Sequence, residues 1–287
     1  MKKNSSTIRR LFLMAGYSAQ NKINSSLVYM IKQFAQYGDV ILFMDNDTPD
    51  TESAKISKYV IHSGAQRHGE YDFGSYKRAY TYARDTGILQ KYDIIYLIND
   101  SVYGPLYPIK PYLQKMESFN TDAFGLVYNP HKKHPHIQSW FIGMRRAVFT
   151  SDWFDKFITS VTQQPNKGAI TYLYEQGFTR LLNEHHITWK CLFSASGRSI
   201  YNNIKHLYRA KVPFIKRAAF TRHNGRLGGQ ILYVLNHTNR SARDSILYDA
   251  RETYGPEYIN WLLTKNPIKI ISRNIKYFIK KIRTEKL

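Results

Sequence analysis

The chain has 287 residues, of which 43% are hydrophobic, enough for one large domain or two modest ones. Its single cysteine, Cys191, excludes a disulfide framework within the chain, and we expect it to be a small buried apolar residue. The 42 Lys and Arg residues exceed the 21 Asp and Glu residues, giving a formal charge of +21. This excess is typical of proteins that bind nucleic acid, an anionic membrane surface or phosphorylated small molecules.

The N-terminus carries positive charges and a short apolar run, from Leu11 to Ala15, which faintly resemble a secretion signal. The run is shorter than the roughly 7–15 residues of a signal core, so we expect the first strand of a domain here. No stretch of the sequence reaches the roughly 20 apolar residues that a membrane span needs.

Between residues 9 and 193, short apolar segments alternate with segments of helical periodicity. The apolar segments predict strands at residues 9–18, 39–47, 59–64, 92–101, 122–128, 139–149 and 187–193. The amphipathic segments predict helices at residues 24–39, 108–118, 150–161 and 170–185, and the segment 71–87 predicts a helix that begins near Ser75. Strands that alternate with helices favour an α/β fold, in which a sheet lies under helices.

After about Phe220 the pattern is mainly helical, and the last residues form a basic amphipathic segment that begins with Asn266 and Pro267, a cap and a first helical residue. Its apolar face consists of Ile268, Ile271, Ile275, Phe278 and Ile282, and its basic side of Lys269, Arg273, Lys276, Lys280 and Lys281. Such a helix either packs on its own domain with a solvated charged side, or attaches to an anionic inner leaflet. Near that surface each basic residue contributes about 1 kcal/mol.

A polar triplet, Asn99-Asp100-Ser101, ends the apolar strand "IIYLIN". It is either turn chemistry or a ligand site, because open α/β sheets bind ligands at the carboxyl ends of their strands. A carboxylate there can hold a hard cation that bridges the two phosphates of a departing diphosphate. Asn99 and Ser101 add only neutral oxygen ligands.

A pair of acids, Asp45 and Asp47, lies at the end of the strand segment 39–47. It matches an Asp-x-Asp motif better than Asn99-Asp100-Ser101 does. The same residues before Thr-Pro are ordinary turn chemistry. A third interpretation is an acid that meets the base or ribose of a nucleotide.

Four motifs in order, "YDFGSYKRAY", "YLINDSVYGP", "HIQSWF" and "YEQGFTRLL", resemble the rhamnan synthesis protein F family of bacterial polysaccharide glycosyltransferases. The later "KVPFIKRAAF" extends the resemblance, which covers roughly Arg9 to Phe220. It implies a nucleotide-sugar donor and a GT-A-like sheet, in which an Asp-x-Asp motif usually holds metal and diphosphate. This chain has Asn-Asp-Ser in that place, so Asp100 is the single matching carboxylate and the need for Mg²⁺ or Mn²⁺ stays open.

The residues expected to bind the donor come from the strand ends and from the segment that contains Ser75. They are Tyr17, Asp45, Asp72, Gly74, Ser75, Asn99, Asp100 and Ser101. Asp72, Gly74 and Ser75 precede the expected helix start. They are either a cap and turn, or a helix N-terminus whose N–H groups face a phosphate or a sugar hydroxyl. The phosphate-binding cations are expected to be Lys77, Arg222 and His223, with Lys216, Arg217 and Arg226 as further candidates.

The motif "HPHIQSWF" is either an edge strand with a polar side or a sugar site for the acceptor, formed by His136, Gln138, Ser139 and Trp140. In an extended segment His136, Gln138 and Trp140 share one face, which suits hydrogen bonds to hydroxyls and stacking on a sugar ring. We do not expect the pair His134 and His136 to bind a metal.

Direct displacement at a sugar carbon needs a base for the acceptor hydroxyl proton. Glu175, on or just before a helix, is either a solvated helix acid or this base, and the family resemblance favours the base. Asp152 and Asp155 are weaker candidates, since Asp152 fits a helix cap.

The sequence therefore predicts a glycosyltransferase that moves a sugar, first of all rhamnose from dTDP-rhamnose or a sugar from a UDP donor, onto a lipid-linked cell-surface or O-antigen glycan by single displacement. We expect a GT-A-like catalytic domain at 7–225, a helical part packed on it at 226–264 and a tail helix at 265–287 that attaches to the cytoplasmic face of the inner membrane. The alternatives are a basic nucleic-acid-binding protein or a membrane-surface scaffold without catalysis. The first of these lacks a recognisable reader motif.

Overall fold

The computed structural model describes residues 8–221 and 227–284, apart from the side chains at 276–278 and 280–284. The chain forms two compact units. Unit 1 contains the described residues up to Asp100 together with Ile109–Ser196, and unit 2 contains Ser101–Pro108 and the described residues from Gly197 onward. The domain boundaries expected after residues 225 and 264 remain a prediction.

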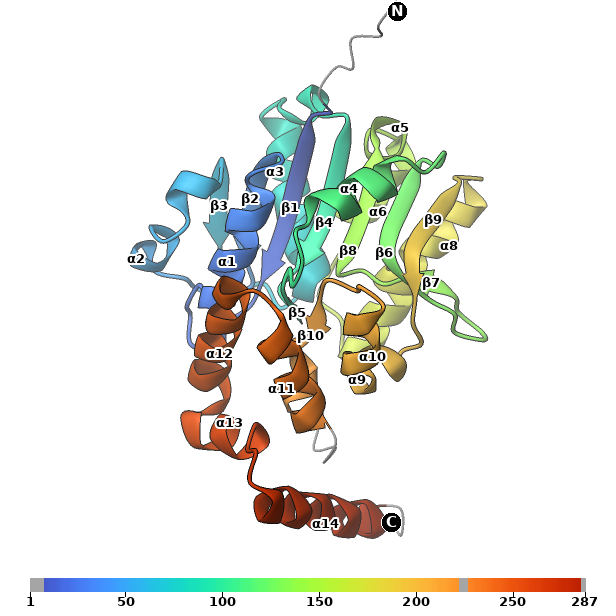
Figure 1. Ribbon diagram of the computed structural model, residues 1–287. Coiled ribbons are helices and arrows are strands. Elements are labelled where there is room, and N and C mark those ends of the chain that lie inside the picture. The colour runs from blue at the N-terminus through green and yellow to red at the C-terminus, as the bar shows by residue number, and fades with distance from the viewer. Residues whose placement is uncertain (1–7, 222–226, 285–287) are drawn as a thin grey trace, which may run out of the picture. The chain divides into compact units, whose positions relative to one another are not determined.

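Unit 1 is built on a mixed eight-stranded sheet, shown in Figure 1. Its strands are β1 (Arg10–Gly16), β2 (Asp39–Met44), β3 (His62–Ala65), β4 (Ile94–Asn99), β6 (Ala123–Asn129), β7 (His136–Ile137), β8 (Phe141–Arg145) and β9 (Trp189–Ser194). The order is β3-β2-β1-β4-β8-β6-β7, and β9 pairs with β6. The first four strands run parallel, whereas β8 is antiparallel to both β4 and β6. The sheet predicted from the alternating pattern is confirmed.

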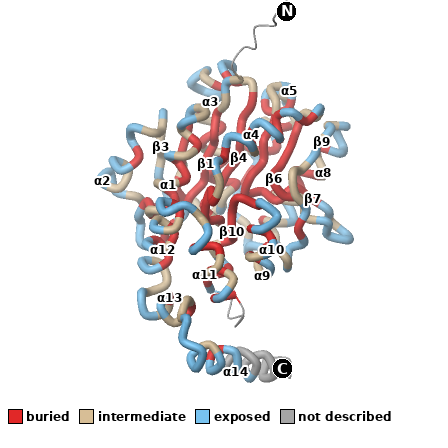
Figure 2. The backbone as a smooth tube through the Cα atoms, viewed as in Figure 1, coloured by how far each residue is buried: buried red, intermediate tan, exposed pale blue. Residues whose placement is uncertain are grey.

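The central strands are apolar over most of their length because both faces of the sheet are covered. Leu13 of β1 stands in register with Ile41 of β2 and with Leu97 of β4, and all three side chains are fully buried. Figure 2 shows the buried central strands as a continuous red band.

Helices cover the two faces of this sheet. Unit 1 contains α1 (Ser25–Phe34), α2 (Asp50–Ser53), α3 (Tyr71–Asp85), α4 (Lys110–Glu117), α5 (Arg146–Phe149), α6 (Asp152–Thr159), α7 (Lys167–Ile170) and α8 (Gln176–Glu184). Short 3-10 turns lie at Ser57–Tyr59 and Leu89–Lys91, and a π-helical turn, Thr171–Glu175, leads into α8.

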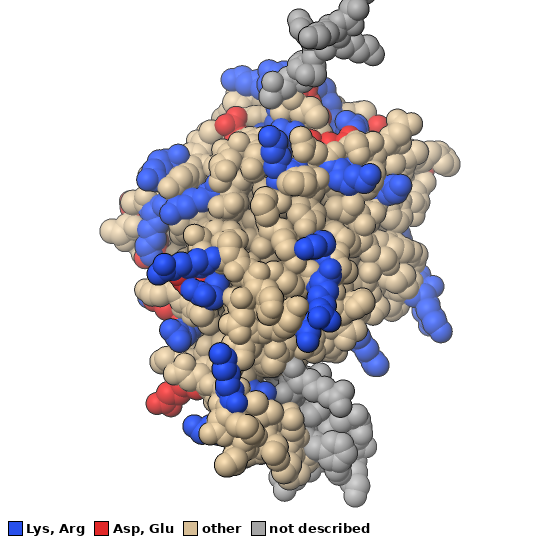
Figure 3. Space-filling model, in the orientation of Figure 1, with Lys and Arg blue, Asp and Glu red and all other residues tan. Residues whose placement is uncertain are grey.

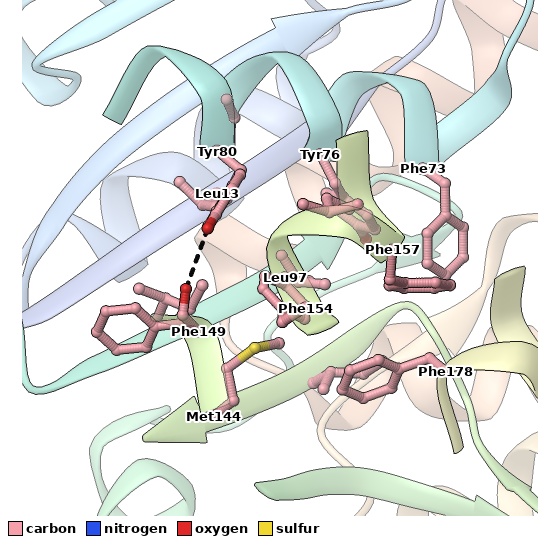
Figure 4. Packing of buried hydrophobic residues seen from close by; sticks show 14 of the residues in the cluster. Leu13, Phe73, Tyr76, Tyr80, Leu97, Met144, Phe149, Phe154, Phe157 and Phe178 are labelled. Atoms are coloured by element: carbon pink, nitrogen blue, oxygen red, sulfur yellow. Dashed lines mark hydrogen bonds between the residues drawn. The ribbon is translucent and has the colours of Figure 1, made fainter. Parts of the chain in front are cut away.

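The two faces have separate aromatic cores. On one face, α3, α6 and α8 contribute Tyr76, Phe154 and Phe178 to the cluster in Figure 4, where the Tyr80 hydroxyl donates to the carbonyl oxygen of Phe149 at 3.2 Å. On the other face, Phe34 of α1 lies 4.9 Å, between ring centroids, from a sheet residue, Phe12. Two packed layers of helices fix the strand ends in place, because close-packed interiors resist displacement.

Unit 2 is mainly helical, as predicted. The pair β5 (Val102–Tyr103) and β10 (Ile215–Lys216) is antiparallel, and a 3-10 turn follows at Arg217–Phe220. The helices are α9 (Ser199–Asn202), α10 (Ile204–Arg209), α11 (Leu227–His237), α12 (Arg240–Tyr254), α13 (Pro256–Leu262) and α14 (Pro267–Thr284). Figure 3 shows Lys and Arg side chains spread over the visible face, among fewer Asp and Glu side chains.

Three local predictions were wrong. The helix expected near Ser75 begins at Tyr71, so Asp72 and Ser75 lie inside it; the acid in the first turn is favourable there because of the helix dipole. The strand expected at 139–149 ends at Arg145 and continues as α5. Cys191 is only partly buried, although its surroundings raise the pKa of its thiol to about 12 by desolvation.

Candidate active site

The parallel strands β1 to β4 end at one edge of the sheet of unit 1. The chain builds outward from β1 through β2 to β3 and then returns to place β4 on the other side of β1. Open α/β sheets bind ligands at such a reversal, outside the carboxyl ends of the strands. Tyr17, Asp45 and Asp100 directly follow β1, β2 and β4.

Asp100 is held at this edge by the neighbouring strand. Its backbone N–H donates to the Ala15 carbonyl oxygen at 3.1 Å, and its Oδ2 accepts the backbone N–H of Tyr17 at 3.2 Å. The residue is 8% exposed. Asn99 has a different partner. Its Nδ2 donates to Oδ2 of Asp72 at 2.8 Å and so connects β4 to α3.

Tyr76, which the sequence analysis missed, lies within electrostatic reach of three acidic residues. Its hydroxyl is fully buried and donates to the Ser139 carbonyl oxygen at 3.2 Å. Burial raises the pKa of this hydroxyl well above its ordinary value, and the negative charges of Asp72, Glu175 and Asp100 add to that shift. The spacing of four residues between Asp72 and Tyr76 on one helix was the available signal.

Glu175 is the last residue of the π-helical turn. Its Oε1 accepts the backbone N–H of Ser139 at 3.0 Å and lies 4.0 Å from Nε2 of His136. The side chain keeps 21% of its surface exposed, so a partly shielded carboxylate faces solvent. Single π turns inside helices are frequent at functional sites.

The expected acceptor residues divide into two groups. His136 accompanies Glu175, and its Nδ1 donates to the His134 carbonyl oxygen at 2.7 Å. Gln138 and Trp140 bind each other instead, with the indole N–H donating to Oε1 of Gln138 at 2.7 Å. Trp140 is 2% exposed, so its ring belongs to the core.

Asp45 and Asp47 fasten the loop that precedes α3. Oδ1 of Asp45 accepts the backbone N–H groups of His68 and Gly69, both at 2.9 Å, and Oδ1 of Asp47 accepts that of Arg67 at 3.1 Å. A carboxylate that accepts several N–H groups stabilises a loop, and Nη1 of Arg67 adds an ion pair 3.2 Å from Oδ1 of Asp45.

Gly74 and Ser75 hold the same loop from the side of α3. Nε2 of His68 lies 3.1 Å from Oγ of Ser75, and Nδ1 of His68 accepts the backbone N–H of Glu70 at 3.1 Å. Burial lowers the pKa of His68 to about 4, so the imidazole is neutral. A Cβ on Gly74 would overlap Glu70 and the His68 ring, which explains the glycine.

Lys77, an expected phosphate ligand, is paired within unit 1. Its Nζ lies 2.8 Å from Oε2 of Glu70 and donates to the Val161 carbonyl oxygen at 2.5 Å. Burial alone would raise the pKa of Glu70, but the hydrogen bonds from Lys77 and Arg78 lower it.

Arg67 provides a more exposed cation at the strand ends. Its guanidinium lies over the Tyr17 ring, 5.2 Å from the centroid, and Nη1 donates to the Asp45 carbonyl oxygen at 2.9 Å. About half of each side chain is exposed, so an aromatic plate and a positive charge border the edge next to Asp100.

The remaining expected residues lie in unit 2. Oγ of Ser101 accepts Nζ of Lys216 at 3.1 Å, and Nη2 of Arg217 pairs with Asp249 at 3.2 Å. Arg222 and His223, expected to bind phosphate, lie outside the described residues, as does Arg226.

Within residues 8–221 and 227–284, no three His, Cys, Asp or Glu side chains are grouped to hold a metal ion. Asp100 nevertheless fits an ion that takes one protein carboxylate and completes its shell with phosphate oxygens and water, as Mg²⁺ commonly does.

The tail helix α14 contradicts the interpretation that its apolar face packs on its own domain. Ile268, Ile271, Ile275 and Ile279 are 78%, 59%, 54% and 46% exposed. Among the described side chains of α14, the buried one is Arg273, at 4%. Its Nη1 donates to the Leu262 carbonyl oxygen, and its guanidinium lies 5.9 Å from the Trp261 ring centroid. None of the described helices has both the length and the apolar character to cross a bilayer.

Solved structures show remote similarity to the chain. The chain has 9% identity to S. aureus TarS 1-349, covering 95% of this chain and 80% of that one at a TM-score of 0.39. It has 13% identity to the glycosyltransferase GlyE of Streptococcus pneumoniae TIGR4, covering 72% of this chain and 49% of that one at a TM-score of 0.42.

A protein of Desulfovibrio desulfuricans G20 described as a nucleotide-diphospho-sugar transferase is 15% identical, with 75% of this chain and 91% of that one covered at a TM-score of 0.39. At these TM-scores the likenesses carry no functional argument. No curated protein matches the chain. Residues 40–283 match the family described as Rhamnan synthesis protein F. The chain belongs to the rhamnan synthesis protein F family of glycosyltransferases.

Proposed function

We propose that unit 1 transfers a sugar from a nucleoside diphosphate to a glycan at the carboxyl edge of its sheet. One observation carries the proposal: Glu175 and the buried Tyr76 hydroxyl both bond Ser139, and Asp72 bonds Asn99, the residue before Asp100 at the end of β4. Clustered carboxylates in a partly shielded environment at such an edge are typical of a catalytic site.

The donor nucleotide would bind at the ends of β1 and β2. The half-exposed Tyr17 ring offers a stacking surface for the base, and the Arg67 guanidinium offers positive charge for the phosphates. Asp45 holds Arg67 in this position through its carbonyl oxygen. The hydrogen bond from the Tyr17 backbone N–H to Oδ2 of Asp100 supports a diphosphate position near the Asp100 carboxylate.

Asp100 is the residue that would hold a divalent cation. Such an ion, when bound, neutralises charge on the departing diphosphate. The Asp100 carboxylate is fixed for this role because the Tyr17 N–H binds one of its oxygens and its own N–H binds β1.

Glu175 is proposed as the general base. In a single displacement the acceptor oxygen forms a bond to the anomeric carbon while the bond to the diphosphate oxygen breaks. The acceptor proton passes to the Glu175 carboxylate, and the nucleoside diphosphate leaves with the bonding electrons. The Ser139 N–H orients this carboxylate at 3.0 Å.

The family, rather than the site, supports the choice of donor and acceptor. We propose rhamnose carried by dTDP, or a UDP-sugar, as donor, and a lipid-linked cell-surface glycan such as an O-antigen as acceptor. The outward isoleucines of α14 and the basic residues of this helix support attachment to the anionic cytoplasmic face of the inner membrane.

The test is to incubate the chain with dTDP-rhamnose and a panel of UDP-, GDP- and CMP-sugars and to measure the released nucleotide. We expect release of a nucleoside diphosphate from at least one donor, increased by a rhamnan fragment or another cell-surface glycan. No release from any donor, with and without Mg²⁺ or Mn²⁺, together with no thermal stabilisation by any nucleoside diphosphate, would contradict the proposal.

A further inference from the structure

Unit 1 has a pocket of about 560 Å³ at the edge of its sheet that lies opposite the candidate active site. Asp39, the first residue of β2, and Ile61, the residue before β3, both line this pocket. The pocket therefore lies at the amino ends of these strands, whereas the residues of the proposed transfer follow the carboxyl ends. Its volume is within the roughly 300–1,000 Å³ that is usual for small-molecule sites.

Two lysines of the pocket lie beside the same aromatic ring. The Lys32 ammonium is 5.3 Å and the Lys58 ammonium 5.1 Å from the centroid of the Tyr59 ring. Both lysines are exposed, and within residues 8–221 and 227–284 neither of them pairs with a carboxylate. Two like charges held at one ring repel each other, and an anion bound between them would replace this repulsion by attraction. A ligand can reach both charges from solvent.

The pocket also contains hydrogen-bond acceptors. Asp39 is exposed, and its Oδ2 accepts the Tyr92 hydroxyl at 2.7 Å, which leaves Oδ1 for a ligand. Nε2 of the exposed Gln36 donates to the Lys32 carbonyl oxygen at 3.0 Å, which leaves Oε1 of Gln36 as a second acceptor. Such oxygens repel a bare anion but bind hydroxyl groups. The pocket therefore suits a ligand that carries both a negative charge and hydroxyls.

We infer that this pocket binds a saccharide that carries a phosphate group. The phosphate lies between Lys32 and Lys58, whose two positive charges match the charge of about −1.5 to −2 on a phosphate monoester at pH 7. Hydroxyls of the sugar donate to Asp39 and Gln36. The side chain of Ile61, which is 46% exposed, contacts the apolar C–H groups of the ring.

The combination of groups separates this ligand from simpler ones. Inorganic phosphate brings the charge without ring hydroxyls, and it meets the negative charge of Asp39. A neutral sugar brings hydroxyls but leaves the two ammonium groups without a counter-charge. The inference goes beyond the proposed transfer and does not depend on it, because the two sites share no residue. The phosphate can belong to a free sugar phosphate or to a phosphate-bearing glycan chain.

The experiment is calorimetric titration of the full chain with mannose-6-phosphate and with the corresponding pentamannose phosphate, compared with mannose and with sodium phosphate. We expect at least one of the two phosphorylated saccharides to bind about tenfold more tightly than mannose or sodium phosphate. Binding of the monosaccharide identifies a free sugar phosphate as the ligand. Binding of the oligosaccharide alone identifies a phosphate-bearing glycan.

Variants assign this binding to the pocket. The double variant Lys32→Gln and Lys58→Gln should bind the phosphorylated saccharide at least tenfold more weakly, because it removes both positive charges. Lys115→Gln is the matched control, since Lys115 is an exposed lysine on α4 outside the pocket, and it should bind like the wild type. Thermal unfolding should give the same Tm for the double variant and the control, because both replace exposed side chains.

Asp39→Asn tests the recognition of hydroxyls. This variant should lose preference for the phosphorylated saccharide over sodium phosphate, because it weakens a hydrogen bond to the sugar and removes a charge that repels the anion. A wild type that binds neither phosphorylated saccharide, or binds sodium phosphate as tightly, would overturn the inference. Equal binding by the double variant and Lys115→Gln would overturn it as well. Asp100→Asn should bind the saccharide like the wild type, so failure of the donor site and failure of this pocket are distinguishable.

Discussion

Glu175 and Ser139 are joined by a 3.0 Å hydrogen bond from a backbone N–H to a carboxylate oxygen, and the carbonyl oxygen of the same Ser139 accepts the Tyr76 hydroxyl. A single residue of the chain thus orients the proposed base on one side and a buried phenol on the other. Because the phenol comes from α3 and the base from the π-helical turn, this contact fixes two helices to the segment between β7 and β8.

Glu175→Gln should keep the fold and lose sugar transfer. The amide oxygen can still accept the Ser139 N–H, but it cannot take a proton, so the transfer rate should fall by about 10²–10⁴-fold. Release of nucleoside diphosphate in the presence of acceptor measures the rate, and thermal stabilisation by the nucleotide should be unchanged. The control is Glu184→Gln, an exposed acid at the end of α8. Full activity of Glu175→Gln would remove this residue from the mechanism.

Asp100→Asn should weaken the response to nucleoside diphosphate together with a divalent cation. The amide can still accept the Tyr17 N–H, so the strand end stays in place, but the negative charge that attracts a cation is lost. We expect the additional thermal stabilisation by Mg²⁺ or Mn²⁺ to disappear in the variant. Asp85→Asn is the control, since the Asp85 side chain is 57% exposed at the far end of α3. Equal metal responses in the two variants would argue against a cation on Asp100.

His68 should make the protein less stable in mild acid. Its pKa is about 4 in the folded chain and about 6.5 when unfolded, so between these values the unfolded state binds more protons. The free energy of unfolding should therefore fall as the pH falls from 6.5 toward 4, by about 1–2 kcal/mol between pH 7 and pH 5.

Urea denaturation of the wild type, His68→Gln and His186→Gln at these two pH values measures this contribution. His68→Gln should show a smaller loss of stability on acidification, because it cannot take up the proton. The exposed His186 serves as control and should leave the wild-type pH dependence intact. An unchanged pH dependence in His68→Gln would contradict a neutral buried imidazole.

Two adjacent glycines of α11 should respond oppositely to alanine. A Cβ on Gly228 would overlap the Leu262 carbonyl oxygen and approach the Arg273 guanidinium, whereas a Cβ on Gly229 meets nothing within 4 Å. Gly228→Ala should destabilise unit 2 by about 1–3 kcal/mol. Gly229→Ala should stabilise it by about 0.5–1 kcal/mol through helix propensity. Thermal or urea unfolding of both variants checks the pair, and a destabilised Gly229→Ala would contradict this packing.

The isoleucine face of α14 should bind anionic bilayers. A double variant, Ile271→Glu and Ile275→Glu, should lose sedimentation with phosphatidylglycerol vesicles, because it places charge on the apolar face. Truncation of residues 267–287 should have the same effect and should move the protein from the membrane fraction to the soluble fraction. Tyr248→Glu is the control for an exposed aromatic residue in the same unit. Equal sedimentation of the double variant and the control would exclude this surface as the membrane contact.

The strands were predictable because a strand that is buried on both faces of a sheet leaves a continuous apolar run, such as "LFLMA" or "IIYLI". The positions of Asp100 and Glu175 at the ends of a strand and of a helical turn were predictable for the same reason. Tyr76 was not, because an aromatic residue on an amphipathic helix has the same pattern whether it fills the core or meets acids.

Contacts across the chain explain the other differences. The Trp140 indole N–H donates to Gln138 and both side chains are buried, which their spacing in the sequence does not reveal. The pairing of Lys77 with Glu70 and the inward turn of Arg273 likewise depend on segments that only tertiary structure brings together. The sequence gives the chemistry of a side chain. The partner that the tertiary structure provides determines whether the side chain is available for binding or catalysis.

The loop fastened by Asp45 and Asp47 keeps its shape through the peptide N–H groups of Arg67, His68 and Gly69. Its conformation is thus independent of whatever occupies the neighbouring edge. If a donor and a cation bind at this edge as proposed, their departure would leave these backbone hydrogen bonds intact. The loop would then not have to refold between turnovers.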